Sequence, residues 1–151
     1  ARKVVIAGFV VGVICSLIGT QIQGEFGPLV TFRVALASGS AFLVAQLVDV
    51  FVFDAVRGGR WWRAPLVSTL IGSSLDTAIF FSVAFAAALT FLDPGNDVTW
   101  ANEAVPLLGM GPLLPLWVSL GVADWLVNLT LALLALIPFR VVVRKLTARP
   151  A

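Results

Sequence analysis

Four long apolar stretches constrain the fold of this chain more than any other feature of its sequence. They cover residues 4–21, 34–56, 65–92 and 113–143, and charged side chains are rare within them. An α-helix rises 1.5 Å per residue, so about 20 residues cross the roughly 30 Å hydrocarbon core of a bilayer. Each stretch reaches or nearly reaches that length. The sequence therefore predicts an all-α, polytopic membrane helix bundle, with four transmembrane helices in one domain over residues 1–151.

The composition supports a membrane protein and argues against metal, cofactor and enzyme chemistry. The chain is 60% hydrophobic and 12% charged, whereas a soluble domain is about 25% charged. It has no histidine and a single cysteine, Cys15, so the usual ligands of zinc and haem are missing. A Ser–His pair or a HExxH motif cannot be built, and the Tyr-Asp and Gly-x-Gly-Asp contexts of diaspartyl intramembrane proteases are absent. We expect no metal, no cofactor and no enzymatic activity.

The basic residues predict the orientation of the chain in the membrane. Nine of the ten lie at the two ends or between the second and third stretches: Arg2, Lys3, Arg57, Arg60, Arg63, Arg140, Arg144, Lys145 and Arg149. Only Arg33 falls on the opposite side, where Asp93, Asp97 and Glu103 also lie. The positive-inside rule then places both ends of the chain in the cytoplasm. The net charge of +2 reflects this topology and not a nucleic-acid-binding patch.

Three aspartates lie inside the predicted spans: Asp49, Asp76 and Asp124. None has a Lys or Arg within one helical turn to neutralise it. A carboxylate at the centre of a membrane helix costs about 2.5–3.5 kcal/mol on insertion scales, so it usually marks a binding site or a polar pathway. Ionised carboxylates suit a cation, an amine or amidine-like N–H groups, and protonated carboxyls could carry protons. The aspartates therefore indicate small-molecule binding or transport.

Each aspartate shares a helix face with other polar or small residues, because spacings of three and four place side chains on one face. The three stripes are Ser38, Phe42, Gln46, Asp49 and Phe53; Thr69, Ser73, Asp76 and Phe80; and Gly121, Asp124 and Asn128. Such stripes face other helices, and the three aspartates fall at similar depths, so they could converge on one cavity. Helix packing alone remains an alternative for Ser38 and the other small residues. Aromatic rings could form walls for a planar heterocycle: Phe42, Phe53, Phe80, Trp117 and Trp125.

Several segments resemble the bacterial queuosine precursor transporter family, a branch of the vitamin uptake transporters. They are residues 33–54 (RVALASGSAFLVAQLVDVFVFD), Trp61-Trp62-Arg63, residues 68–81 (STLIGSSLDTAIFF) and Gly121-Val-Ala-Asp124. The resemblance implies a multi-pass protein of the bacterial inner membrane that imports deazaguanine precursors, in the cyano or aminomethyl form. Its partners would be this nucleobase-like substrate and the lipid bilayer, not nucleic acid.

The resemblance also assigns roles to residues at matching positions. It implies that Gln46, Asp49, Ser73, Asp76 and Asp124 bind the substrate, with the carboxylates accepting from its guanine-like edge or its amine. The helical stripes add Ser38, Phe42 and Asn128 to the expected substrate-binding residues.

One departure from the family leaves an alternative open. The resemblance implies six spans, two of them before the Arg-Lys segment at the start of this sequence, and we expect those two to lie upstream in the gene or to be missing from it. In the second case the chain would be a truncated, non-transporting relative that serves as an accessory structural subunit of a larger membrane complex. A homo-oligomer, and a proton-coupled carrier of another nucleobase or vitamin, also stay open.

Overall fold

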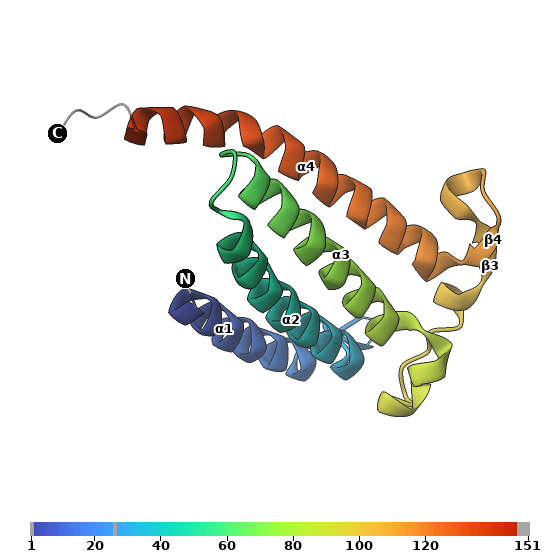
Figure 1. The fold of residues 1–151 in the computed structure, drawn as a ribbon. Coiled ribbons are helices and arrows are strands. Elements are labelled where there is room, and N and C mark those ends of the chain that lie inside the picture. The colour runs from blue at the N-terminus through green and yellow to red at the C-terminus, as the bar shows by residue number, and fades with distance from the viewer. Residues whose placement is uncertain (1, 26, 148–151) are drawn as a thin grey trace.

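The computed structural model describes residues 2–25 and 27–147, and its architecture is mostly helical. The four long helices are α1 (Arg2–Gln21), α2 (Phe32–Val56), α3 (Arg63–Phe85) and α4 (Leu116–Thr147). All four are long and apolar enough to cross a membrane, judged by length and composition. The predicted fold class is thereby confirmed. The helices lie side by side in chain order, so that each packs on the next (Figure 1).

Helices α3 and α4 differ in extent from the apolar stretches that contain them. α3 ends at Phe85 because Ala86 adopts an extended backbone, with φ −61° and ψ 130°, and residues 87–92 form a short 3-10 helix instead. α4 begins after Pro115 and continues through Pro138 to Thr147. Figure 1 shows α4 bending in its last third, as expected for a proline inside a helix, which removes one backbone hydrogen bond.

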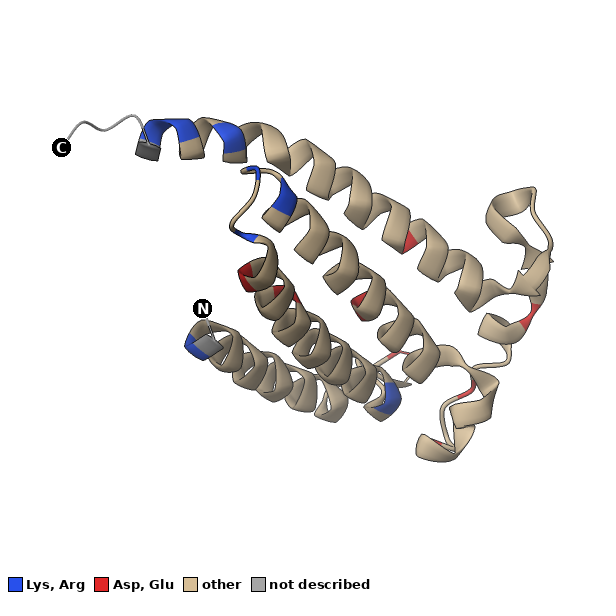
Figure 2. Ribbon diagram, in the orientation of Figure 1, with Lys and Arg blue, Asp and Glu red and all other residues tan. Residues whose placement is uncertain are grey.

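The connection between α3 and α4 is compact and carries little regular structure. Its strands β3 (Ala104–Pro106) and β4 (Leu113–Pro115) pair antiparallel, with Val105 opposite Leu114. A second short pair, β1 (Gln23–Gly24) and β2 (Gly27–Pro28), joins α1 to α2. Both hairpins lie at one end of the helix row, and most basic residues lie at the other end (Figure 2).

Small residues bring α2 and α3 into close contact. Ala37, Ala41 and Ala45 recur every four residues along α2 and are all buried. On α3, a Cβ added to Gly72 would lie 3.4 Å from the Cβ of Asp49 and 3.6 Å from the carbonyl oxygen of Ala45. Small side chains permit such close helix crossings in membranes. The closeness of α2 and α3 fixes the relative positions of the polar stripes that the two helices carry.

Arg33, the one basic residue on the hairpin side, is fully buried. Its Nε donates a 2.6 Å hydrogen bond to the carbonyl oxygen of Val83, and its Nη2 donates to that of Ala86. The last carbonyls of a helix have no partner within the helix, so Arg33 at the start of α2 caps the end of α3. Nη1 is buried and has no hydrogen-bond partner in the described part of the chain. The count of basic residues used only the position of Arg33 in the sequence, and its burial and capping contacts were not predicted.

Candidate functional site

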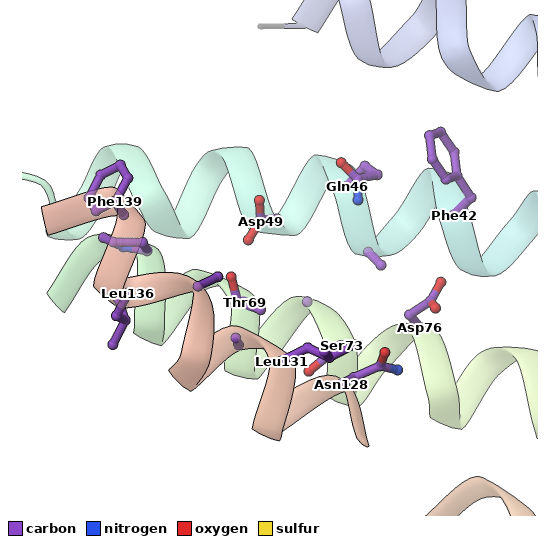
Figure 3. Close-up of a pocket in the computed structure, with 15 residues that line it drawn as sticks. Phe42, Gln46, Asp49, Thr69, Ser73, Asp76, Asn128, Leu131, Leu136 and Phe139 are labelled. Carbon is purple, nitrogen blue, oxygen red and sulfur yellow. The ribbon is translucent and has the colours of Figure 1, made fainter. Parts of the chain in front are cut away.

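A cavity of about 560 Å³ lies between α2, α3 and α4 (Figure 3). Its volume falls within the roughly 300–1,000 Å³ typical of small-molecule pockets. Its lining combines polar side chains with small and apolar ones: Phe42, Ala45, Gln46, Asp49, Pro65, Thr69, Gly72, Ser73, Asp76, Asn128, Leu131, Ala132, Ala135, Leu136 and Phe139.

Helical periodicity explains why these residues meet. Residues spaced by three or four share a helix face, and the cavity is lined from α2 and α3 by two such runs: Phe42, Gln46 and Asp49, then Thr69, Ser73 and Asp76. α4 contributes Asn128 and continues along the same face with Ala132 and Ala135. The structure thus brings together six of the eight residues expected to bind substrate: Phe42, Gln46, Asp49, Ser73, Asp76 and Asn128.

The two carboxylates of the cavity lack a basic counterpart. Asp49 and Asp76 come from adjacent helices, and no Lys or Arg is among the described residues that line the cavity. The Oδ1 atom of Asp49 is buried and has no hydrogen-bond partner within residues 2–25 and 27–147. A buried acceptor without a donor costs free energy of about 1–3 kcal/mol, more when it is charged. A ligand that carries N–H donors or a positive charge would remove this cost.

Asp124 lies one helical turn before Asn128 on α4 and is not part of the cavity lining. Its Oδ2 accepts a 2.9 Å hydrogen bond from Thr77 Oγ1 on α3 and a 3.0 Å bond from Asn128 Nδ2 on α4. Thr77 is only 8% exposed, so this cluster sits between the two helices. Asp124 therefore reaches the cavity through Asn128. The other expected residue outside the lining, Ser38, is exposed on α2.

The aromatic residues are distributed differently from the expectation. Of the five rings proposed as walls, Phe42 lines the cavity. Trp117 and Trp125 line a separate hollow of about 300 Å³ between α3 and α4. Phe80 packs edge-to-face against Phe81 and Phe85, with centroid distances of 5.2 and 6.2 Å.

Nine of the fifteen lining residues were not among those expected to bind substrate, and for two of them, Thr69 and Phe139, the sequence carried a signal. Phe139 lies four residues after Ala135 and seven after Ala132, which is the spacing of a single helix face. Thr69 belongs to the stripe of Ser73 and Asp76. Including all of the Thr69 stripe, and continuing the Asn128 stripe about three turns toward the end of α4, would have found these residues.

Comparisons with known proteins agree with the transporter resemblance. A family model described as "Putative vitamin uptake transporter" matches residues 1–143. A "Probable queuosine precursor transporter" of Haemophilus influenzae is 35% identical over 124 residues, which are 78% of this chain and 44% of that protein. The "Queuosine precursor transporter" of Escherichia coli is 37% identical over 97 residues, which are 56% of this chain and 43% of that protein.

The matched segments thus span less than half the length of these two curated relatives. No solved structure matches the chain significantly. The family model covers nearly the whole sequence, and the four apolar helices agree with a multi-pass membrane protein. The chain belongs to the vitamin uptake transporter family, a family of membrane transporters and not of enzymes.

Proposed function

We propose that this chain forms the substrate-binding part of a bacterial inner-membrane transporter that imports a queuosine precursor, a deazaguanine in its cyano or aminomethyl form. The observation that carries the proposal is the pair of carboxylates, Asp49 and Asp76, in a cavity whose described lining holds no basic residue. The names of the two relatives supply the substrate class.

The chemistry of the cavity suits such a ligand. Asp49 and Asp76 project from facing helices (Figure 3) and would accept hydrogen bonds from the ring N–H and exocyclic amine of a guanine-like edge. Hydrogen bonds to charged acceptors are stronger than neutral ones. Gln46 carries an amide that can donate to the carbonyl oxygen of the ring. Phe139 offers a flat apolar surface against which a planar ring can lie, whereas the ring of Phe42 extends toward α1, where a Cβ on Gly8 would lie 3.7 Å from its Cζ.

An uptake experiment tests the proposal. Cells that can neither make nor import queuosine precursors would express the intact gene and receive labelled aminomethyl deazaguanine. We expect labelled precursor to accumulate well above the level in cells with an empty vector, and unlabelled cyano deazaguanine to compete with it. Equal accumulation with and without the protein, when the protein is present in the membrane, would refute the proposed function.

We also propose that both ends of the chain and the loop between α2 and α3 face the cytoplasm, as the positive-inside rule predicts. Two glycines allow a direct test, Gly58 in that loop and Gly95 in the connection between α3 and α4. A Cβ added at Gly58 meets nothing within 4 Å, and at Gly95 its nearest neighbour is Asp93 Oδ1 at 4.0 Å. In a Cys15→Ser background, each would be replaced by cysteine.

A membrane-impermeant thiol reagent should then label the Gly95→Cys variant, and not the Gly58→Cys variant, in intact spheroplasts. Inside-out vesicles should give the reverse pattern. Labelling of Gly58→Cys in intact spheroplasts would mean that the orientation is inverted.

A further inference from the structure

Asp124 is the intramembrane aspartate that the cavity itself does not use. We propose that it is a positioning residue that determines specificity: it holds Asn128 so that the amide nitrogen points away from the cavity and the carbonyl oxygen points into it. The wall of α4 then presents an acceptor, and the site selects planar rings that carry adjacent N–H donors. This inference rests on the proposed function and deepens it.

The first step is the hydrogen bond between the two side chains. Asn128 Nδ2 lies 3.0 Å from Asp124 Oδ2. An ionised carboxylate can only accept hydrogen bonds, so the group that faces it must be the N–H₂ end of the amide. Thr77 Oγ1 donates to the same oxygen at 2.9 Å. Because both donors use Oδ2, a proton on the other carboxyl oxygen would leave this arrangement unchanged, and the orientation of Asn128 holds in either protonation state.

The second step is the position of Asn128 at the cavity. Its side chain is part of the lining, whereas Asp124 is not. With Nδ2 held against Asp124, Oδ1 is the acceptor atom that Asn128 leaves for a ligand. A bond to a residue one turn away along α4, outside the lining, therefore sets the polarity of a group that faces the cavity.

The third step is that most of the other polar groups in the cavity are also hydrogen-bond acceptors. Asp49 and Asp76 are acceptors, and the hydroxyl of Ser73 donates to the carbonyl oxygen of Leu70 at 3.4 Å, which leaves its lone pairs for a ligand. One N–H of Asn128 is committed to Asp124, so the N–H donors left among the described lining residues are the second N–H of Asn128 and the amide of Gln46. The cavity thus offers acceptor oxygens from three helices and few N–H donors.

This pattern matches a guanine-type edge, which has one carbonyl oxygen beside a ring N–H and an exocyclic amine. An adenine-type edge has a bare ring nitrogen in place of the N–H. That lone pair would face acceptor oxygens and stay unpaired, and sites built around hydrogen bonds reject such analogues strongly. The arrangement therefore assigns the discrimination between the two edges to Asn128 and, through it, to Asp124.

Equilibrium binding to the intact protein in lipid nanodiscs tests this inference, with deazaguanine and deazaadenine as probes. The wild-type protein should prefer deazaguanine. The Asp124→Asn variant should lower the ratio of the two affinities about tenfold, the effect of one misplaced hydrogen bond, because an amide at position 124 can face either end of Asn128. Adding Asn128→Asp to Asp124→Asn should restore the preference, since the carboxylate at 128 offers oxygen in every orientation and the new amide at 124 donates to it.

The matched control is Trp125→Phe. It removes the 2.9 Å bond from Trp125 Nε1 to Ser74 Oγ, which joins the same two helices at the second hollow, and it should leave the affinity ratio unchanged. An Asp124→Asn protein that keeps the wild-type ratio would overturn the inference and leave the proposed function standing. A double variant that does not prefer deazaguanine would also overturn the inference. If Asp124→Asn alone does not fold, the double variant still provides the test. Failure of the wild-type protein to bind either ring would instead overturn the proposed function.

Discussion

The Asp76→Asn variant is expected to lower uptake of aminomethyl deazaguanine by about 10- to 100-fold. Asp76 lines the cavity, and the substitution keeps the size of the side chain while removing its charge. A hydrogen bond to a charged group contributes about 1.5–3 kcal/mol, which corresponds to roughly that range in affinity. The neutral cyano form should lose less than the cationic aminomethyl form. Initial rates of uptake of the two labelled precursors, normalised to protein in the membrane, measure both effects.

The matched control is Asp54→Asn, which makes the same change of side chain at an aspartate outside the cavity lining. Asp54 is exposed and pairs with Arg57, with Oδ1 and Nη1 3.5 Å apart. Exposed ion pairs contribute little to stability, so uptake of both precursors should stay at the wild-type level. Unchanged uptake of the aminomethyl form by the Asp76→Asn variant would remove Asp76 from the binding site.

The four helices and their polar faces could be predicted from the sequence because both depend on local patterns. Apolar length identifies a membrane helix, and the 3.6-residue period identifies which side chains share a face. The run Phe42, Gln46 and Asp49 follows directly from that period, and the structure places all three at the cavity. The same holds for Ser73 and Asp76.

The position of Asp124 could not be predicted in this way. Asp124 and Asn128 are one turn apart and share a face of α4, yet Asn128 lines the cavity and Asp124 packs against Thr77. The rotation and crossing of α4 against α3 decide which of the two meets the cavity. Those quantities depend on contacts between helices, such as Gly121, where an added Cβ would lie 3.3 Å from the ring of Phe81. A pattern within one helix does not contain them.

The burial of Arg33 could not be predicted from local sequence either. Its sequence neighbourhood, between two apolar stretches, is that of an ordinary loop base. The carbonyl groups that it caps lie 50 and 53 residues further along the chain. Its burial is therefore a property of the packed helices.

Replacing Arg33 by methionine is expected to destabilise the protein strongly. The substitution keeps much of the apolar stem but leaves the carbonyl oxygens of Val83 and Ala86 without their donors. A buried polar group left unsatisfied costs about 1–3 kcal/mol, so the two together should lower the free energy of unfolding by roughly 2–6 kcal/mol. Arg33→Lys should fall between methionine and the wild type, because a single ammonium group lacks the planar fork that serves both carbonyls. Thermal unfolding in detergent measures the series.

Arg57→Met provides the control, since the side chain of Arg57 is 69% exposed and its loss should leave the unfolding midpoint nearly unchanged. In the proposed orientation Arg33 is the one base on the non-cytoplasmic side, so its effects on stability and on orientation can be measured separately. If Arg33 caps α3, the Arg33→Met variant should unfold at a lower temperature. Gly95→Cys should keep its labelling pattern when Arg33→Met is added to it. A wild-type midpoint for Arg33→Met would show that the buried guanidinium is dispensable. The capping role would then have to be abandoned.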